Sequence, residues 1–376
     1  MKRIGVTGAE GFLGSALMRR LQWSTDWVVS PCPRSCWESG EEMLKWTANQ
    51  DVIVHLAGKN RANSPEEVYE VNLDLTDKLI TALSAQKKST KVIFSSSIQE
   101  SRENQYGQSK KLAREKWHQW AEENQQSFIG LLIPNLFGPF GKPFYNSVVA
   151  TFCHQVVRGE SPSIQVDAEL PLIYVDDCVL EIMRFIESDV LMNDMVEVNP
   201  TFHVKVSDIL QELQDFQNRY LTSGEMPNLD SKWRLYLFAT FQSYINWKEF
   251  FPFHLKKNTD QRGSFVEVIR LSSGGQVSFS TTVPAIVRGN HFHTRKMERF
   301  AVIKGKAKIA FRKVDESEIF EFYLDGSEPS FVDMPVWYTH SIENVGEEEL
   351  LTLFWINEHY DASDPDTYFT NVDPQR

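Results

Sequence analysis

A cluster of histidines and one glutamate constrains this chain more than any other segment. His291 and His293 are two residues apart, Glu298 follows on the same segment, and His340 comes later in the chain. Residues two apart on a β-strand face the same side of a sheet, so the first two histidines can point together into a barrel. Imidazole and carboxylate ligands suit a divalent metal such as zinc, iron, nickel or manganese. The spacing therefore predicts a metal site inside a small β-barrel, and zinc is the metal we expect.

Length and charge limit the class of protein. A chain of 376 residues is long for a single core and predicts two domains. A formal net charge of −12 argues against a nucleic-acid partner, although local donors could still bind an anionic small molecule. No apolar run is long enough to cross a bilayer, and a strand starting at residue 3 leaves no room for a signal peptide. The four cysteines lack the spacing of a disulfide framework, so we expect a cytoplasmic protein. Without a long apolar run, we also expect that it binds no membrane.

The chain opens with a strand, a glycine-rich turn and a helical run. Gly8 permits a tight turn, Gly11 lets the backbone approach a pyrophosphate, and Gly14 lets the helix pack closely. This order predicts a dinucleotide-binding site in a doubly wound parallel sheet of Rossmann type. The other candidate cofactor-binding residues follow Gly11 or end the next buried strand: Phe12, Leu13, Leu56 and Ala57.

The second predicted strand, at residues 27–30, bears on the type of dinucleotide. It lacks the acidic residue that usually binds the ribose hydroxyls, and Arg34 follows just beyond it. A cation at this place favours the extra phosphate of NADP. The alternative is that Arg34 is a solvated loop residue and that the cofactor is NAD. We expect NADP(H).

A second group of polar residues lies where a later buried strand gives way to a helix. Ser97 ends the strand, and Tyr106 and Lys110 open the helix, four residues apart on one helical face. A cation on that face lowers the pKa of a phenol, which makes it a proton donor or acceptor near neutral pH. Asn72 lies in the preceding helix.

These segments together resemble the extended short-chain dehydrogenase/reductase family. The resemblance implies that Ser97, Tyr106 and Lys110 are the catalytic residues and that Asn72 supports them. Ser96 is the alternative to Ser97, because both follow the same strand.

Residues 134–139 resemble the nucleotide-sugar branch of that family, which implies that Asn135 lies in the substrate pocket. The chain departs from the branch in two places. Leu132 stands where many relatives carry arginine, and the loop from Ser97 to Tyr106 is unusually short. We therefore expect an active site that is more open on one side.

The second half of the chain reads as an all-β domain. An aromatic-rich segment at residues 224–253 predicts a helix packed between domains or subunits, and residues 256–263 form the expected boundary. The predicted domains are residues 1–245 and 255–376. Short alternating segments predict strands at 264–271, 276–281, 300–304, 306–314, 318–324 and 350–355.

The histidine cluster resembles the first cupin motif, and residues 335–344 resemble the second. Ala285 and Trp337 stand where the family commonly has glycine, and we expect the indole to lie at the mouth of the site. A reductase followed by a cupin resembles the CapF-type capsular-polysaccharide assembly enzymes, nearly from end to end. That resemblance implies a UDP-sugar substrate and a homodimer. It also implies that the cupin epimerises C3 of a 4-keto sugar before the reductase reduces C4 with NADPH, which gives UDP-2-acetamido-2,6-dideoxy-L-talose.

Carbonyl chemistry supports this order. A hydrogen beside a ketone is acidic, and a cation on the ketone oxygen stabilises the enolate, so epimerisation must precede reduction. The epimerase base stays open among Lys296, Tyr338 and His359. Two other functions also stay open for the cupin: a metal-dependent oxygenase, or a dimerising or sugar-binding module.

Overall fold

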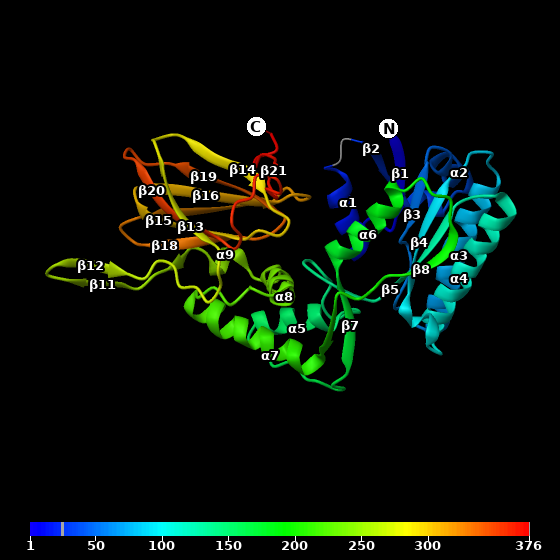
Figure 1. Cartoon of the computed structure of the whole chain (residues 1–376), viewed down its shortest axis with the longest axis horizontal. Helices are drawn as coiled ribbons and strands as arrows, with labels where there is room; N and C mark the ends of the chain where they lie inside the picture. Colours follow the sequence, from blue (N-terminus) through cyan, green and yellow to red (C-terminus); the bar gives the residue numbers. More distant parts are fainter. Residues whose placement is uncertain (24–25, 376) are drawn as a thin grey trace. The chain divides into compact units, whose positions relative to one another are not determined.

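The computed structural model describes residues 1–23 and 26–375 (Figure 1). The chain forms two compact units, made of residues 1–151 with 165–206 and of residues 152–164 with those from 207 onward. Each unit has its own sheets and is described by itself. In the described part of the chain, no helix combines the length and the apolar character needed to span a membrane.

A six-stranded sheet forms the centre of the first unit. Its strand order is β2-β1-β3-β4-β5-β8, and every pairing is parallel. The order reverses between β1 and β3, so the carboxyl ends of these two strands flank the crevice where ligands bind in such sheets. The strands are β1 (Lys2–Thr7), β2 (Trp27–Pro31), β3 (Val52–His55), β4 (Lys91–Ser97), β5 (Phe128–Ile133) and β8 (Asn193–Glu197).

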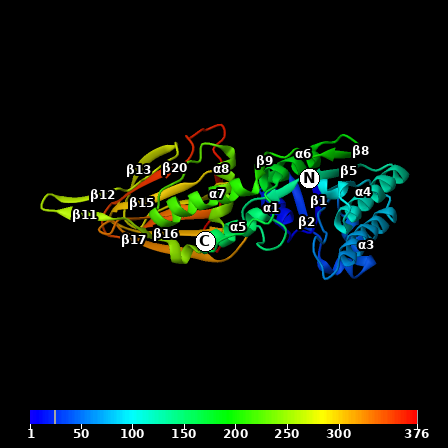
Figure 2. The same cartoon turned by 90° about the horizontal axis from the view of Figure 1, so that it is seen from below.

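Helices cover both faces of this sheet, which confirms the predicted doubly wound fold (Figures 1 and 2). On one face, Leu17 and Ile182 belong to a core that also contains β1 and β3 residues. On the other face, Trp46, Leu79 and Trp117 pack on β4 and β5. The helices are α1 (Phe12–Leu21) and α6 (Val175–Glu187) on the first face, and α2 (Gly40–Ala48), α3 (Pro65–Ser84) and α4 (Gln105–Asn124) on the second.

A smaller sheet lies after β5. Its order is β6-β7-β9, with a parallel and an antiparallel pairing. It contains β6 (Asn135–Phe137), β7 (Glu169–Tyr174) and β9 (Phe202–Lys205), and helix α5 (Val148–Val157) comes between the first two in sequence.

The second unit is mostly antiparallel β-structure, as predicted for a cupin-like barrel. Its two five-stranded sheets have the orders β10-β18-β15-β20-β13 and β17-β16-β19-β14-β21. A separate hairpin of β11 (Lys257–Asp260) and β12 (Gly263–Val266) lies between β10 and β13 in sequence. The sheet strands are β10 (Phe253–His254), β13 (Gln276–Thr282), β14 (Val287–Phe292), β15 (Glu298–Lys304), β16 (Lys306–Lys313), β17 (Ile319–Asp325), β18 (Ser330–Met334), β19 (Tyr338–Asn344), β20 (Leu350–Ile356) and β21 (Tyr368–Phe369).

The aromatic segment that we assigned to the end of the first domain belongs to this second unit. The boundaries between the two units therefore lie at other residues than the predicted domain limits, 245 and 255. The rings of Phe251 and Phe253 lie 6.3 and 5.0 Å from that of Phe331 in β18, and β10 pairs with β18. The helical elements of the unit are α7 (Val206–Phe216), a π-helical turn (Gln217–Leu221), α8 (Lys232–Gln242) and α9 (Trp247–Phe250).

The expected strands agree only in part with those of the second unit. The one expected at 264–271 ends at Val266, and β18 was not expected. All five residues of β18 are buried, so their sequence lacks the alternation by which half-buried strands are recognised.

Candidate active sites

The glycine turn after β1 has the geometry that a dinucleotide site needs. Gly8 has a φ of +68°, and a Cβ there would lie 2.7 Å from the backbone nitrogen of Ala57. A Cβ at Gly14 would lie 2.0 Å from the Gly8 oxygen. A Cβ at exposed Gly11 would meet only that oxygen, at 3.2 Å, so packing explains this third glycine least. It leaves the N-terminus of α1 accessible, as pyrophosphate binding requires.

Thr7 and His55 tie together the ends of β1 and β3, and the sequence did not point to either. The Thr7 Oγ1 lies 2.7 Å from His55 Nδ1, and it accepts hydrogen bonds from the N–H groups of Leu56 and Ala57, each at 3.2 Å. Burial, with a smaller contribution from the charge of Lys110, lowers the pKa of His55 to about 3. The ring is therefore neutral, and it fixes the loop that carries two of the predicted cofactor contacts.

Arg34 lies in the 3₁₀ turn that follows β2, close to the glycine turn. Its Nη2 is 2.7 Å from Oε2 of Glu10, and both side chains are exposed. The Arg34 cation therefore lies beside the glycine turn, paired with a carboxylate to which the sequence did not point.

Tyr106 and Lys110 share one face of α4, and Ser97 lies at the end of β4. The Ser97 side chain lies close enough to Tyr106 to influence the pKa of its phenol, while Lys110 Nζ donates to the Ser95 carbonyl at 2.8 Å. Burial raises the pKa of Tyr106 to about 12, against a smaller lowering by Ser97, and burial lowers the pKa of Lys110 to about 8. Our expectation of a lowered tyrosine pKa was therefore wrong, because burial dominates the pKa of this phenol. Tyr106 carries its proton at neutral pH.

The two adjacent serines differ in their partners. Ser96 Oγ donates to Glu100, which Arg114 also binds through Nε at 3.0 Å and Nη2 at 2.9 Å. Ser97 is the one whose side chain influences the pKa of Tyr106. This geometry favours Ser97 over Ser96 as the catalytic hydroxyl.

Asn72 is buried and organises the surroundings of Lys110. Its Nδ2 donates to the Lys59 carbonyl and to Ser109 Oγ, each at 3.0 Å, and its Oδ1 accepts from the Lys59 N–H at 2.7 Å. Ser109 Oγ in turn donates to the Tyr106 carbonyl at 2.8 Å. These bonds fit a supporting role. Asn135 is tied to β7 through a bond from its Nδ2 to the Pro171 carbonyl at 3.1 Å.

The second unit brings the four predicted metal ligands together. His291 lies in β14, His293 just after it, Glu298 begins β15 and His340 lies in β19. One ligand atom from each lies within 4.8 Å of the others. Glu298 Oε2 is 3.0 Å from His340 Nε2 and 3.5 Å from His293 Nε2. Two ligand atoms that each lie about 2 Å from the same cation are separated from one another by roughly these distances.

The polar atoms of this cluster fit a divalent cation. His293 Nε2 is buried and has no hydrogen-bond partner among residues 1–23 and 26–375, although it faces the carboxylate. Burial would raise the pKa of Glu298, but the neighbouring imidazoles of His293 and His340 hold it well below its usual range. An ionised carboxylate and three imidazoles are the donor set that zinc and iron bind.

The two departures from the cupin pattern share one backbone property. Ala285 has a φ of +63° and Trp337 a φ of +66°, a region where glycine carries no penalty. The Trp337 ring is buried and stacks on Phe292, with centroids 5.7 Å apart. It therefore belongs to the core, and our expectation that it lies at the mouth of the site was wrong.

The three candidate bases differ in their surroundings. Lys296 is almost fully buried and donates through Nζ to the Pro365 carbonyl at 2.9 Å. Burial raises the pKa of Tyr338 to about 12, and its ring packs against Trp247, which disfavours it as a base. His359 is exposed.

Comparison with known proteins places both units. Residues 4–197 match the NAD dependent epimerase/dehydratase family, and residues 258–368 match the polysaccharide biosynthesis C-terminal domain. The UDP-2-acetamido-2,6-beta-L-arabino-hexul-4-ose reductase of Pseudomonas aeruginosa is 33% identical over 98% of this chain and 99% of its own. The spore coat polysaccharide biosynthesis protein SpsL of Bacillus subtilis is 25% identical over 30% of this chain and 81% of its own.

A solved structure matches the chain as a whole. The capsular polysaccharide assembling protein CapF of Staphylococcus aureus is 37% identical, with a TM-score of 0.63, over 98% of this chain and 100% of its own. The chain therefore belongs to the NAD dependent epimerase/dehydratase family, and within it to the CapF-type proteins that join a short-chain reductase fold to a C-terminal β-barrel.

Proposed function

We propose that this protein is a bifunctional nucleotide-sugar enzyme. The barrel epimerises C3 of a UDP-4-keto-2-acetamido-2,6-dideoxyhexose, and the first unit then reduces C4 with NADPH. The product is UDP-2-acetamido-2,6-dideoxy-L-talose, on the route to UDP-N-acetyl-L-fucosamine for capsule or O-antigen. The observation that carries the proposal is that a Ser97–Tyr106–Lys110 set and a cluster of three histidines with Glu298 occur in one chain. The P. aeruginosa relative is a reductase of a UDP-hexul-4-ose, which supports the reduction step.

The reductase residues have roles that follow from their protonation and contacts. A bound nicotinamide cofactor would supply the hydride. Tyr106 keeps its proton at neutral pH and can donate it to the ketone oxygen as the alcohol forms. Ser97, which lies near Tyr106, would orient the same oxygen, and Lys110 holds the tyrosine face of α4 against β4 through Ser95.

The barrel residues suit proton removal beside a ketone. A divalent cation would supply Lewis-acid stabilisation of the enolate oxygen. His291, His293, Glu298 and His340 would hold it. Among the candidate bases, Lys296 is the one that belongs to the loop between the metal ligands His293 and Glu298, and its Nζ donates to the Pro365 carbonyl.

The remaining parts of the proposal are the cofactor, the metal and the assembly. Arg34 beside the glycine turn supports NADP(H), and the imidazole and carboxylate donors support zinc. We also propose a cytoplasmic homodimer with a UDP-sugar substrate and residue Asn135 in the substrate pocket.

A test uses the full chain and a UDP-4-keto sugar in deuterated water. Without NADPH, mass spectrometry should show uptake of one deuterium and no reduction. Addition of NADPH should then give a product that carries this deuterium and is two hydrogens heavier than the ketone. Reduction without prior exchange would instead make the barrel a binding module, and oxygen consumption with ferrous iron would make it an oxygenase.

A further inference from the structure

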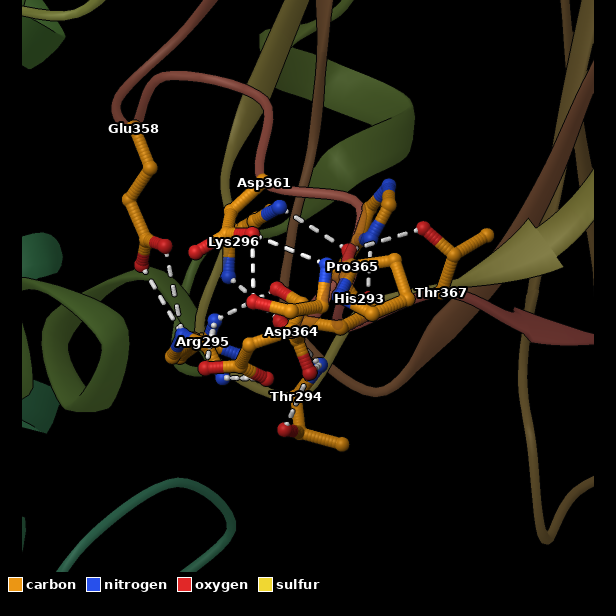
Figure 3. A network of polar contacts seen from close by, with 11 residues as sticks. His293, Thr294, Arg295, Lys296, Glu358, Asp361, Asp364, Pro365 and Thr367 are labelled. Carbon is orange, nitrogen blue, oxygen red and sulfur yellow. Dashed lines mark hydrogen bonds and ion pairs between the residues drawn. The ribbon is translucent and has the colours of Figure 1, made fainter.

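The metal-ligand loop is held by a segment far away in the sequence. Residues 294–296 follow the second histidine, and residues 364–367 lie against them. Figure 3 shows His293, Thr294, Arg295 and Lys296 gathered around the stretch that contains Asp364, Pro365 and Thr367. The contacts that join the two segments converge on Asp366, which is 4% exposed.

The carboxylate of Asp366 collects the donors of the loop. It accepts from the N–H of Thr294 at 3.1 Å, from Thr294 Oγ1 at 2.6 Å, from the N–H of Arg295 at 2.9 Å and from the N–H of Lys296 at 3.1 Å. Three consecutive backbone donors turned toward one anion fix the path of the loop between the second histidine and Glu298.

The backbone of the same residue holds a predicted metal ligand. His293 Nδ1 lies 2.6 Å from the Asp366 carbonyl oxygen, which can only accept, so the proton resides on Nδ1. The lone pair is then on Nε2, the buried atom that faces Glu298. Ligating histidines usually have such an outer partner, which sets the tautomer and the ring orientation.

The conformation of Asp366 explains how one residue makes both sets of contacts. Its φ is +45°, in the left-handed region that aspartate and asparagine enter more readily than other non-glycine residues. The segment then continues into β21, where Phe369 pairs with His291 and Tyr368 with Phe292. His291 and His293 are therefore both held by residues 366–369.

We propose that Asp366 is the positioning residue of the metal centre: its carboxylate shapes the loop at residues 294–296, and its carbonyl selects the metal-binding tautomer of His293. The inference rests on the metal site of the proposed function. It adds that the loop at residues 294–296 keeps its metal-binding shape only when residue 366 carries a negative charge. Asn keeps the left-handed backbone and the carbonyl bond to His293, but its amide nitrogen cannot accept from the loop N–H groups.

The test compares the full chain with Asp366→Asn. The matched control is Asp364→Asn, the same exchange two residues away at an exposed carboxylate that pairs with the side chain of Arg295. Zinc affinity is measured by competition with a chromophoric chelator, and the visible spectrum of the cobalt-substituted protein reports the ligand geometry. We expect Asp366→Asn to weaken zinc binding by about 10- to 100-fold and to change the cobalt spectrum, while Asp364→Asn changes neither.

The outcomes separate this inference from the proposed function. Wild-type protein that binds no zinc would overturn the metal site itself. If Asp366→Asn binds zinc with the wild-type affinity and gives the wild-type cobalt spectrum, only the role of Asp366 is overturned. A lowered melting temperature of this variant with unchanged zinc affinity would overturn that role as well. Should Asp366→Asn fail to fold, Thr294→Val removes one donor to the carboxylate; it should weaken zinc binding several-fold, and unchanged affinity in this variant would likewise contradict the proposal.

Discussion

Glu298 Oε2 lies 3.0 Å from His340 Nε2, although the two residues begin or occupy strands of different sheets. The contact places a carboxylate and an imidazole between the two sheets of the barrel. Both side chains are at least nine-tenths buried, so a pair of this kind must be compensated by further partners. His291 and His293 are these further partners. The four residues together form the donor set of a divalent cation, which is why we assign one to this cluster.

Removal of one ligand should therefore release the metal. Purified wild-type protein should contain close to one equivalent of metal per chain, and His291→Ala much less, because three ligands with a buried carboxylate bind more weakly than four. Elemental analysis after dialysis measures this. Full retention of metal in His291→Ala would remove that residue from the site.

Arg34 should decide between the two dinucleotides. Arg34→Ala should raise the KM for NADPH by roughly tenfold or more and leave the KM for NADH nearly unchanged, because only NADPH carries the extra phosphate. Glu10→Gln is the companion variant. It frees Arg34 from its exposed ion pair and should lower the KM for NADPH slightly. Equal effects of Arg34→Ala on both cofactors would reject the assignment.

His55 should make the first unit sensitive to acid. Its pKa is about 3 in the folded chain against an ordinary 6.5. Between these values the unfolded chain binds a proton that the folded chain does not, so stability falls as the pH falls from 6.5. The slope from this group is about 1.4 kcal/mol per pH unit.

The measurement is urea unfolding from pH 7.5 to pH 5. His55→Asn retains an acceptor for Thr7 but does not titrate, so its free energy of unfolding should fall less steeply with acid than that of the wild type. His118→Asn, at an exposed histidine of the same unit, should keep the wild-type slope. A slope in His55→Asn equal to that of the wild type would contradict the assignment.

Disruption of a buried ion pair should strongly destabilise the barrel. Arg299 Nε and Asp333 Oδ1 lie 2.7 Å apart, both side chains are about 1% exposed, and Tyr220 donates to Asp333 at 2.7 Å. Asp333→Asn leaves the guanidinium without its countercharge and should cost about 3 to 5 kcal/mol. Glu318→Gln breaks the exposed pair with Lys248 and should cost about 1 kcal/mol or less. Similar effects of both variants in chemical denaturation would be inconsistent with this account.

Local patterns predicted much of the two sites. The glycine turn, the spacing of Tyr106 and Lys110, and the paired histidines at 291 and 293 depend on neighbours within one turn or one strand. The structure brings each of these sets together as expected. The fold class followed from the same local patterns.

Contacts between distant segments could not be predicted in this way. Asp366 lies 73 residues from His293, and the bond between His55 and Thr7 spans 48 residues. Neither Asp366 nor His55 belongs to a local sequence pattern that indicates its distant partner. The pKa of Tyr106 was misjudged for a related reason: the spacing showed a nearby cation, but burial depends on the whole fold.

The most direct test of the central claim is deuterium exchange by two variants of the full chain. Tyr106→Phe lacks the proton donor, so it should reduce nothing and still exchange the substrate hydrogen with deuterated water. His340→Ala should not exchange, but it should oxidise NADPH when given the epimerised ketone, and a mixture of both variants should form product. Loss of exchange in Tyr106→Phe would show that the reductase site itself performs the epimerisation, which contradicts the division of labour proposed for the two units.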